Sequence, residues 1–324
     1  MKKIEIKEFG GPEVLEIKNV DIGKPGQNEV LVKNLSIGIN YIDTYHRSGL
    51  YPIPLPSGIG LEACSIIEEV GSEVKLFKVG DRVTRASMPI GTYSEKQIIP
   101  EDKLVKVPDN ISDEVASCIT LKGITAEYLL HRTYQVKKGD KILYHAAAGA
   151  LGQIFCPWAN ALGAEIIGTV GSDEKIEIAK KNGCHHVINY NEKNFVEEVE
   201  KIVGKNGLDV VYDGVGAKTF EGSIEVLKVR GMMVAFGNAS GYVHTLDIKK
   251  HMNAKGLFFT RPSIAHYTII RKELEEAAEK VFEAISKGKF KVEISKKYSL
   301  DEVRKAHEDL EGRKLLGPAI ILPN

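Results

Sequence analysis

Residues 141–152 join an apolar run to a stretch of small residues, a pattern that can bind a phosphate group. Residues 141–144 are typical of a buried strand, and residues 153–162 of a helix that ends at a glycine. Such a turn presents backbone N–H groups together with the positive end of a helix. The spacing fits G-x-G-x-x-G, with Ala147 in the first glycine position, then Gly149 and Gly152. A plain packing turn gives the same match, and the units that follow decide for phosphate binding.

The next strand, expected at residues 165–170, ends where a dinucleotide site selects its ribose. An NAD site places a carboxylate there to accept a hydrogen bond from the 2′-hydroxyl. Here Gly171 and Ser172 follow the strand, and no carboxylate stands at its tip. Asp173 is the rival for that role. Its position also fits an acidic first-turn residue of a helix capped by Ser172, which the helix dipole favours.

Two further residues near this strand end could bind a phosphate on the ribose 2′-oxygen. Lys175 lies one turn into the expected helix, and Tyr190 ends the third strand. A lysine at such a position is more often a solvated surface residue, so its position alone does not establish the role.

Strand–helix units continue after the phosphate turn. Strands are expected at 165–170, 186–190, 208–212, 232–236 and 256–260, with amphipathic helices between them, one of them ending at Gly183. Apolar strands that alternate with amphipathic helices predict a parallel sheet covered on both faces. The architecture is α/β, a Rossmann doubly wound sheet.

The first hundred residues differ, because short alternating runs separated by glycine and proline predict a compact β-rich, barrel-like domain. Within it, residues 38–51 are dense in polar and aromatic side chains, and composition alone favours a helix with a tyrosine face. Helices are expected from Ser112, at 121–130, from Pro262 to about 287 and at 300–310. The tail is too short for its own domain. We therefore expect one domain at 1–122 and 263–324, and a cofactor domain at 123–262.

Composition excludes several classes of protein. The 324 residues contain 44 Lys plus Arg and 44 Asp plus Glu, so no overall charge favours nucleic acid or an anionic membrane. No run of eighteen apolar residues and no apolar signal segment occur, so we expect a cytoplasmic protein. The four cysteines have no metal-ligand spacing, and Cys64 and Cys118 fit small core residues. His185 and His186 are interpreted as surface residues.

The chain resembles quinone oxidoreductases of the zeta-crystallin type, within the medium-chain dehydrogenase/reductase superfamily. The resemblance runs nearly end to end and is greatest to the bacterial NADPH-dependent enzymes. It rests on residues 9–15, 38–43, 47–52, 56–62, 79–83, 121–125, 145–149, 213–216 and 236–238. Two positions depart from the family pattern: Ala150 replaces a second glycine, and Pro157 replaces a glutamine. Pro157 also removes an N–H inside the expected helix, so we expect a kink.

The resemblance implies a GroES-like catalytic domain beside the Rossmann domain and an NADPH site. Its cofactor residues would be Asn40, Lys122, Thr125, Ala148, Gly149, Ala150, Leu151, Gly171, Ser172, Lys175, Tyr190, Phe236, Gly237, Asn238 and Arg313. Tyr45 and Tyr51 would line the acceptor pocket beside the nicotinamide, in an interdomain cleft.

The resemblance also bears on zinc. Zinc-dependent relatives have a Gly-His-Glu triplet where this chain reads Gly60-Leu61-Glu62, and the usual ligand cysteine is absent from residues 38–43. No cluster of four cysteines follows Met88. Without these ligands a tetrahedral zinc set is not available. We expect an enzyme without zinc, in which Glu62 hydrogen-bonds nearby backbone.

The expected activity is NADPH-dependent reduction of a quinone. Reduction of the C=C bond of an enone is the neighbouring alternative, and an NADPH-binding RNA-binding or structural protein is a third. The balanced charge gives this third alternative no support. A homodimer is expected through the cofactor domains, near residues 247–259.

Overall fold

The computed structural model describes residues 1–323, which divide into two compact units. Unit 1 contains Met1–Ile124, Tyr267–Ser286 and Val292–Asn324, of which Asn324 lies outside the described residues. Unit 2 contains Thr125–His266 and Lys287–Lys291. The chain therefore leaves unit 1 within a helix and returns to it near the C-terminus.

Unit 2 is built on a parallel sheet of six strands. Its strands are β9 (Lys141–Tyr144), β10 (Glu165–Val170), β11 (His186–Asn189), β12 (Leu208–Asp213), β13 (Leu227–Ala235) and β14 (Phe258–Thr260). They pair in the order β11-β10-β9-β12-β13-β14, and every pairing is parallel. This is the 3-2-1-4-5-6 order of the doubly wound fold, so the predicted Rossmann architecture is confirmed.

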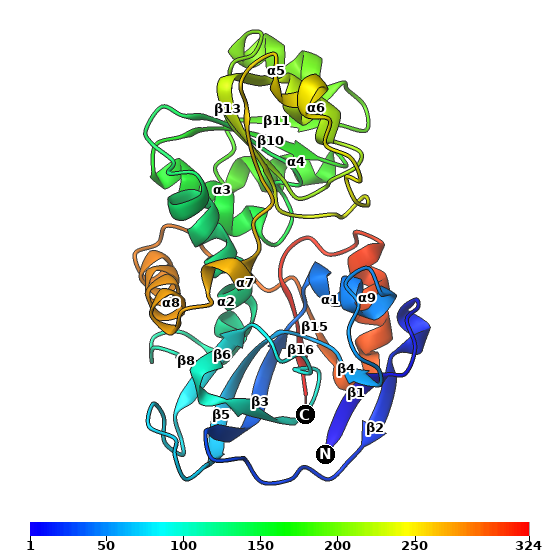
Figure 1. Cartoon of the computed structure of the whole chain (residues 1–324), viewed down its shortest axis with the longest axis vertical. Coiled ribbons are helices and arrows are strands. Elements are labelled where there is room, and N and C mark those ends of the chain that lie inside the picture. The colour runs from blue at the N-terminus through cyan, green and yellow to red at the C-terminus, as the bar shows by residue number, and fades with distance from the viewer. Residues whose placement is uncertain (324) are drawn as a thin grey trace. The chain divides into compact units, whose positions relative to one another are not determined.

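Helices cover both faces of this sheet because its strands are apolar on both sides. They are α3 (Gly152–Ala161), α4 (Glu174–Lys181), α5 (Phe195–Val203) and α6 (Phe220–Glu225). On one face, Val199 of α5 and Ile224 of α6 pack on Leu143 and Val211. Figure 1 shows α5 and α6 side by side. On the other face, the Phe155 ring of α3 stacks on Tyr144, with 4.4 Å between ring centroids.

Unit 1 is a β-rich domain that both chain ends complete. Its larger sheet runs β15-β16-β3-β5-β6-β8, with β7 paired to β3, and a small sheet runs β2-β1-β4. The strands are β1 (Lys2–Ile6), β2 (Glu16–Asn19), β3 (Glu29–Gly38), β4 (Ser57–Gly58), β5 (Glu62–Val70), β6 (Arg82–Ala86), β7 (Lys96–Pro100), β8 (Val105–Lys106), β15 (Lys296–Ser299) and β16 (Ala319–Leu322). C-terminal β16 pairs with β3, so the tail closes a sheet that the N-terminal residues begin.

Four longer helices complete the fold: α1 (Tyr41–Ser48), α2 (Asp113–Tyr128), α8 (Arg271–Ser286) and α9 (Val303–Glu311). Two helical predictions were wrong in extent. The helices expected from Ser112 and over 121–130 are one helix, α2. The helix expected from Pro262 is broken into α7 (Ile264–Tyr267) and α8, and the β-branched run of residues 268–270 between them disfavours helix.

The expected Ser172 cap is also wrong. Helix α4 begins at Glu174, and the Ser172 hydroxyl donates to the Glu174 carboxylate instead of accepting from backbone. Gly183, in the left-handed region at φ 87°, ends this segment as predicted. Helix α3 includes Pro157 within its bounds.

Candidate functional site

The turn between β9 and α3 exposes backbone donors at a helix start. Within the described part of the chain, the backbone N–H groups of Ala148, Ala150 and Leu151 donate no hydrogen bond, and they precede or open α3. A Cβ on Gly152 would lie 2.3 Å from the Ala147 carbonyl oxygen, so this glycine permits close packing of helix and strand. On Gly149 a Cβ would meet only the Ala146 oxygen, at 3.1 Å. The turn thus leaves Gly149 open and its neighbours' N–H groups unused, as an anion site requires.

A buried polar cluster fixes the strand ends beneath this turn. His145, which follows β9, has hydroxyl partners on both ring nitrogens: Thr169 of β10 and Ser223 of α6, each at 2.9 Å. Asp213, at the end of β12, accepts from Ser223 and from the Thr219 hydroxyl. Burial lowers the pKa of His145. The imidazole is therefore a neutral brace between three strands and α6, and it has no exposed face for catalysis.

The tip of β10 lacks a free carboxylate. The Asp173 carboxylate accepts a hydrogen bond from the Asn189 side chain at 2.9 Å, which is a structural role. The Asn191 amide binds the Gly171 oxygen at 2.7 Å, and the Tyr190 N–H binds the Val170 oxygen. Tyr190 is thus brought to the end of β10, while Lys175 is half-buried on α4 nearby in the chain.

The remaining predicted residues of unit 2 lie at the end of β13 and on α2. The Phe236 N–H donates to the backbone carbonyl oxygen of Asp213 at 2.9 Å. A Cβ on Gly237 would lie 2.4 Å from the backbone carbonyl oxygen of Gly214. Asn238 and Thr125 are buried. The segment after β13 therefore runs close beside the segment after β12.

In unit 1, Asn40 and Lys122 meet at Glu62. The Lys122 ammonium donates to the Asn40 side-chain oxygen at 2.7 Å and to the Glu62 carboxylate at 3.0 Å. The Asn40 amide donates to the same carboxylate at 2.8 Å, and the Leu121 N–H binds its other oxygen at 2.7 Å. Lys122, Glu62 and Asn40 are all buried. We refer to them as the Glu62 triad.

The hydrogen bonds of the Glu62 triad occupy donors and acceptors of Asn40 and Lys122. Its geometry bears out the predicted backbone hydrogen bond of Glu62 and adds an ion pair. The Asn40 side chain is engaged within the triad, whereas Lys122 uses two of its three N–H donors there. A Cβ on Gly38 would lie 2.5 Å from the Glu62 carboxylate, so the glycine makes room for this buried charge.

Tyr45 and Tyr51 are brought together by α1 and the loop after it. Their rings contact edge-to-face with 5.1 Å between centroids. The Tyr51 N–H donates to the backbone carbonyl oxygen of Tyr45 at 3.1 Å. Tyr41 packs on Tyr45 from the preceding turn. Burial raises the pKa of Tyr41 and Glu311 adds to this, while Arg313 opposes it. Arg313 itself is exposed, with φ 58°.

Three residues near α1 were not predicted. Asp43, Tyr93 and His307 are buried and form a row of two hydrogen bonds. The Tyr93 hydroxyl donates to the Asp43 carboxylate at 2.9 Å, and the His307 Nε2 atom contacts the Tyr93 hydroxyl at 3.2 Å. Asp43 lies within the family motif at residues 38–43, but nothing in the sequence links it to residues 93 and 307.

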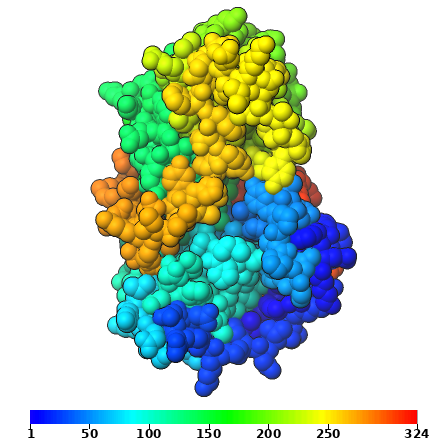
Figure 2. All heavy atoms as spheres, in the orientation of Figure 1, coloured from blue at the N-terminus to red at the C-terminus, as the bar shows by residue number. Residues whose placement is uncertain are grey.

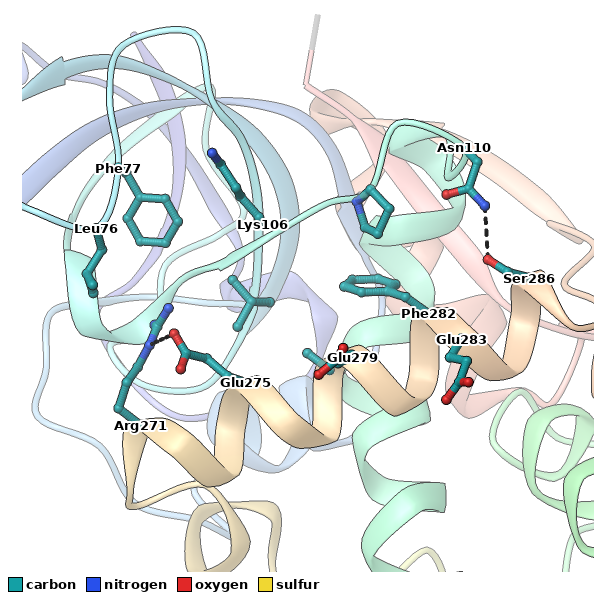
Figure 3. A pocket seen from close by; sticks show the side chains of 13 residues that line it. Leu76, Phe77, Lys106, Asn110, Arg271, Glu275, Glu279, Phe282, Glu283 and Ser286 are labelled. Carbon is teal, nitrogen blue, oxygen red and sulfur yellow. Dashed lines mark hydrogen bonds and ion pairs between the residues drawn. The ribbon is translucent and has the colours of Figure 1, made fainter.

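A cavity of about 500 Å³ lies elsewhere in unit 1, between α8 and β8 (Figure 3). Phe77, Phe282 and Ala278 line it with a rim of charged side chains that includes Arg271 and Glu279. None of the predicted site residues lines it. Among the described residues no group of three His, Cys, Asp or Glu could hold a metal ion, and no helix there is long and apolar enough to cross a membrane.

Each of the two units contains residues that match a known protein family. The zinc-binding dehydrogenase family matches residues 150–287, and the alcohol dehydrogenase GroES-like domain matches residues 26–109. A quinone oxidoreductase of Pseudomonas aeruginosa is 43% identical, with 99% of each chain covered. Quinone oxidoreductase 1 of Escherichia coli is 46% identical, again with 99% of each covered. The chain belongs to the quinone oxidoreductase family of the medium-chain dehydrogenase/reductase superfamily.

Solved structures of this family agree with the fold in detail. The crystal structure of the Escherichia coli quinone oxidoreductase complexed with NADPH matches with a TM-score of 0.97, 46% identity and complete coverage of both chains. A 2-haloacrylate reductase structure matches with a TM-score of 0.89 and 41% identity, also over both whole chains. The GroES-like and Rossmann domains predicted from the sequence are thus confirmed.

Proposed function

We propose that this protein reduces quinones with NADPH. The observation that carries the proposal is the full-length match, with a TM-score of 0.97, to a quinone oxidoreductase structure that contains NADPH. The phosphate turn and the tip of β10 support it independently, because their groups fit a phosphorylated dinucleotide.

The residues named from the family resemblance would hold the cofactor. Backbone N–H groups of Ala148, Ala150 and Leu151 suit the pyrophosphate, and Gly149 lets the backbone approach it closely. Gly171, Ser172, Lys175 and Tyr190 would surround the 2′-phosphate, with Arg313 contributing charge. Phe236, Gly237, Asn238, Thr125, Asn40 and Lys122 would position the ring end. When bound, NADPH supplies the reducing equivalents through carbon C4 of its nicotinamide.

Lys122 would act through the donor that the Glu62 triad leaves unused. Its ammonium spends two N–H groups on Asn40 and Glu62, and the third can reach a ligand oxygen. Because the Glu62 carboxylate neutralises the buried ammonium, Lys122 presents a fixed donor and little net charge.

Tyr45 and Tyr51 would hold the acceptor oxygen. A phenol donates one hydrogen bond to such an oxygen, and the mutual edge-to-face contact restricts both rings. The oxygens of a reduced quinone can take protons from water, so the proposal requires no strong general acid.

Reduction of an activated C=C bond is the second candidate. It is favoured by a 2-haloacrylate reductase of a Burkholderia species, 43% identical with 98% of each chain covered. This reaction protonates carbon, so it would require a proton donor beside the acceptor, which quinone reduction does not.

We also propose a cytoplasmic homodimer joined through the Rossmann units and free of zinc. Strand β14 is an edge of its sheet, and its Phe258 side chain is 57% exposed. Ile248 nearby in the chain is 71% exposed. Figure 2 shows the yellow-to-orange stretch of residues 230–260 on the surface of unit 2. An exposed edge strand with apolar side chains invites pairing with a second copy. Light scattering tests the homodimer, and elemental analysis tests the absence of zinc.

A substrate panel tests the proposed activity. NADPH oxidation is followed against benzoquinones, naphthoquinones, enones and 2-haloacrylates, with products identified by mass. The proposal expects the highest kcat/KM with a quinone. A higher kcat/KM with an enone or haloacrylate would favour the second candidate, and no oxidation with any acceptor would contradict both.

A further inference from the structure

A chain of hydrogen-bonded polar side chains, four of the five buried, joins the two ends of α1. Arg47, in its last turn, donates to the Glu311 carboxylate at 2.8 and 2.9 Å and to His307 at 3.0 Å. His307 contacts the Tyr93 hydroxyl at 3.2 Å, and that hydroxyl donates to Asp43, in the first turn of α1, at 2.9 Å. We call these five residues the α1 clamp. Arg47, His307, Tyr93 and Asp43 are each no more than 2% exposed.

The chemistry of its side chains fixes which group donates and which accepts in each hydrogen bond of the α1 clamp. A guanidinium only donates, so the His307 Nδ1 atom must accept from Arg47. The proton of the neutral ring then lies on Nε2 and is donated to the Tyr93 oxygen, which leaves the Tyr93 proton for Asp43. Burial lowers the pKa of His307 to about 3, and the Arg47 charge adds to this. The ring therefore stays neutral and keeps this tautomer.

The α1 clamp stabilises a helix that is too short to be stable by itself. Eight residues are too few for a stable isolated helix. Asp43 and Arg47 lie one turn apart and are both held by the clamp, and Arg47 also fixes the main chain, because it binds the Gly10 oxygen through its Nε atom. The rotation of α1 about its axis is thereby set. The Asp43 carboxylate also accepts from the Asn40 N–H at 2.9 Å, which ties the clamp to the Glu62 triad.

We propose that the α1 clamp sets the rotation of α1, so that Tyr93 and His307 are positioning residues for the reaction, acting through Tyr45 and Asn40. The inference rests on the proposed function, since Tyr45 and Asn40 are its acceptor-side residues. Neither Tyr93 nor His307 is proposed to touch the acceptor. Each acts by holding a helix whose small rotation would displace the Tyr45 ring, and displacements of about 1 Å can cost a hundredfold in rate.

The first test compares two tyrosines. Tyr93→Phe removes the donor to Asp43 and keeps the ring. Tyr298→Phe removes a similar bond in the same unit, from Tyr298 to Asp309 at 2.8 Å, outside the α1 clamp. We expect Tyr93→Phe to lower kcat/KM for the acceptor by about tenfold, with the NADPH dissociation constant within about twofold of wild type. Tyr298→Phe should leave both constants near wild type. Equal losses in the two variants would overturn the proposal.

The second test uses rescue at His307. Glutamine can accept from Arg47 and donate to Tyr93 as the neutral imidazole does, whereas leucine can do neither. His307→Gln should therefore keep kcat/KM within about threefold of wild type, and His307→Leu should fall about as far as Tyr93→Phe. A glutamine variant as impaired as the leucine variant, with both folded by circular dichroism, would contradict a hydrogen-bonding role.

Imidazole nitrogen NMR gives a readout that does not depend on activity. We expect the His307 signal, assigned by its loss in His307→Gln, to show a neutral ring with its proton on Nε2 between about pH 5 and 8. A charged ring or the other tautomer would overturn the α1 clamp even in an active enzyme. The expected tautomer in a protein that reduces no acceptor would instead contradict the proposed function alone.

Discussion

The phosphate turn of unit 2 relies on backbone groups, whereas the surroundings of α1 in unit 1 rely on buried charged side chains. The turn comes from one continuous stretch, residues 141–152, and presents N–H groups that need no particular side chain. The α1 clamp and the Glu62 triad draw residues from positions 40 to 311 and bury Lys122, Glu62, Asp43 and Arg47. A local backbone site tolerates substitutions such as Ala150, while a site of paired charges depends on every partner.

Removing one charge from the Glu62 triad should give the largest effect. Lys122→Met leaves the Glu62 carboxylate buried without its cation, which costs roughly 3–5 kcal/mol of folding free energy. Calorimetric unfolding measures the loss. The double variant Lys122→Met/Glu62→Gln, which removes both charges, should recover a large part of it. A single variant as stable as wild type would show that the pair is not a structural unit.

Asp43 should make stability depend on pH. Burial raises the pKa of Asp43 to about 7 from 3.8, opposed by the bonds from Asn40 and Tyr93 and by the Lys122 charge, while Glu62 reinforces it. The folded-state pKa lies above the unfolded one, so this contribution to stability is complete below about pH 4 and is lost as pH rises through about 7.

Asp43→Asn removes that dependence. Its stability relative to wild type should rise by about 2–3 kcal/mol between pH 5 and 8. Unfolding of both proteins by urea at the two pH values measures this difference. A constant difference across the range would mean that Asp43 titrates normally.

In unit 2, Lys175→Ala should weaken NADPH binding by about ten- to a hundredfold, the loss of roughly 1.5–3 kcal/mol for a hydrogen bond to a charged group. NADH binding should barely change. Lys180→Ala is the control, since Lys180 lies on the same helix and pairs with Glu177 at the surface. Equal losses for both cofactors would point to a folding effect.

The two glycines of the phosphate turn should separate folding from binding. Gly152→Ala places a Cβ against the Ala147 backbone and should cost about 1–3 kcal/mol of stability. Gly149→Ala should cost less stability than Gly152→Ala, because its Cβ would meet one atom, the Ala146 oxygen at 3.1 Å, and yet should abolish NADPH binding. Gly23→Ala, with no atom within 4 Å, is the control. Calorimetry and NADPH titration distinguish these outcomes.

The tyrosines should give the smallest effect. Tyr45→Phe or Tyr51→Phe removes about one neutral hydrogen bond, roughly 0.5–1.5 kcal/mol, or at most about tenfold in kcat/KM for the quinone. NADPH affinity should not change. A loss of about a thousandfold in kcat with the fold intact would identify a true acid and favour C=C reduction.

Features built from one continuous stretch of chain could be predicted from the sequence, whereas contacts between distant positions could not. The Rossmann sheet follows from local patterns of apolar and small residues, and the structure confirms it. The phosphate turn and the absence of a carboxylate at the expected strand end were inferred from the same local patterns and remain predictions. Family motifs pointed to Asn40 and Lys122. They did not reveal that both bind Glu62, because that contact joins β5, α2 and the start of α1. The resemblance was needed to choose a cofactor role for Lys175.

Tyr93 and His307 could not be predicted at all. They are separated by 214 positions and meet only in the folded domain. In the sequence a lone histidine in an amphipathic helix looks like any other. Its role depends on a tautomer that Arg47 imposes, and this is a property of the packed structure.

The cofactor preference of the wild-type enzyme tests whether the protein is an NADPH-dependent quinone reductase. With one quinone as acceptor, kcat/KM is measured for NADPH and for NADH under the same conditions. We expect at least about a tenfold preference for NADPH, because Lys175 and Tyr190 are proposed to bind the 2′-phosphate and the Asp173 carboxylate is engaged by Asn189. Equal use of both cofactors, or a preference for NADH, would contradict it.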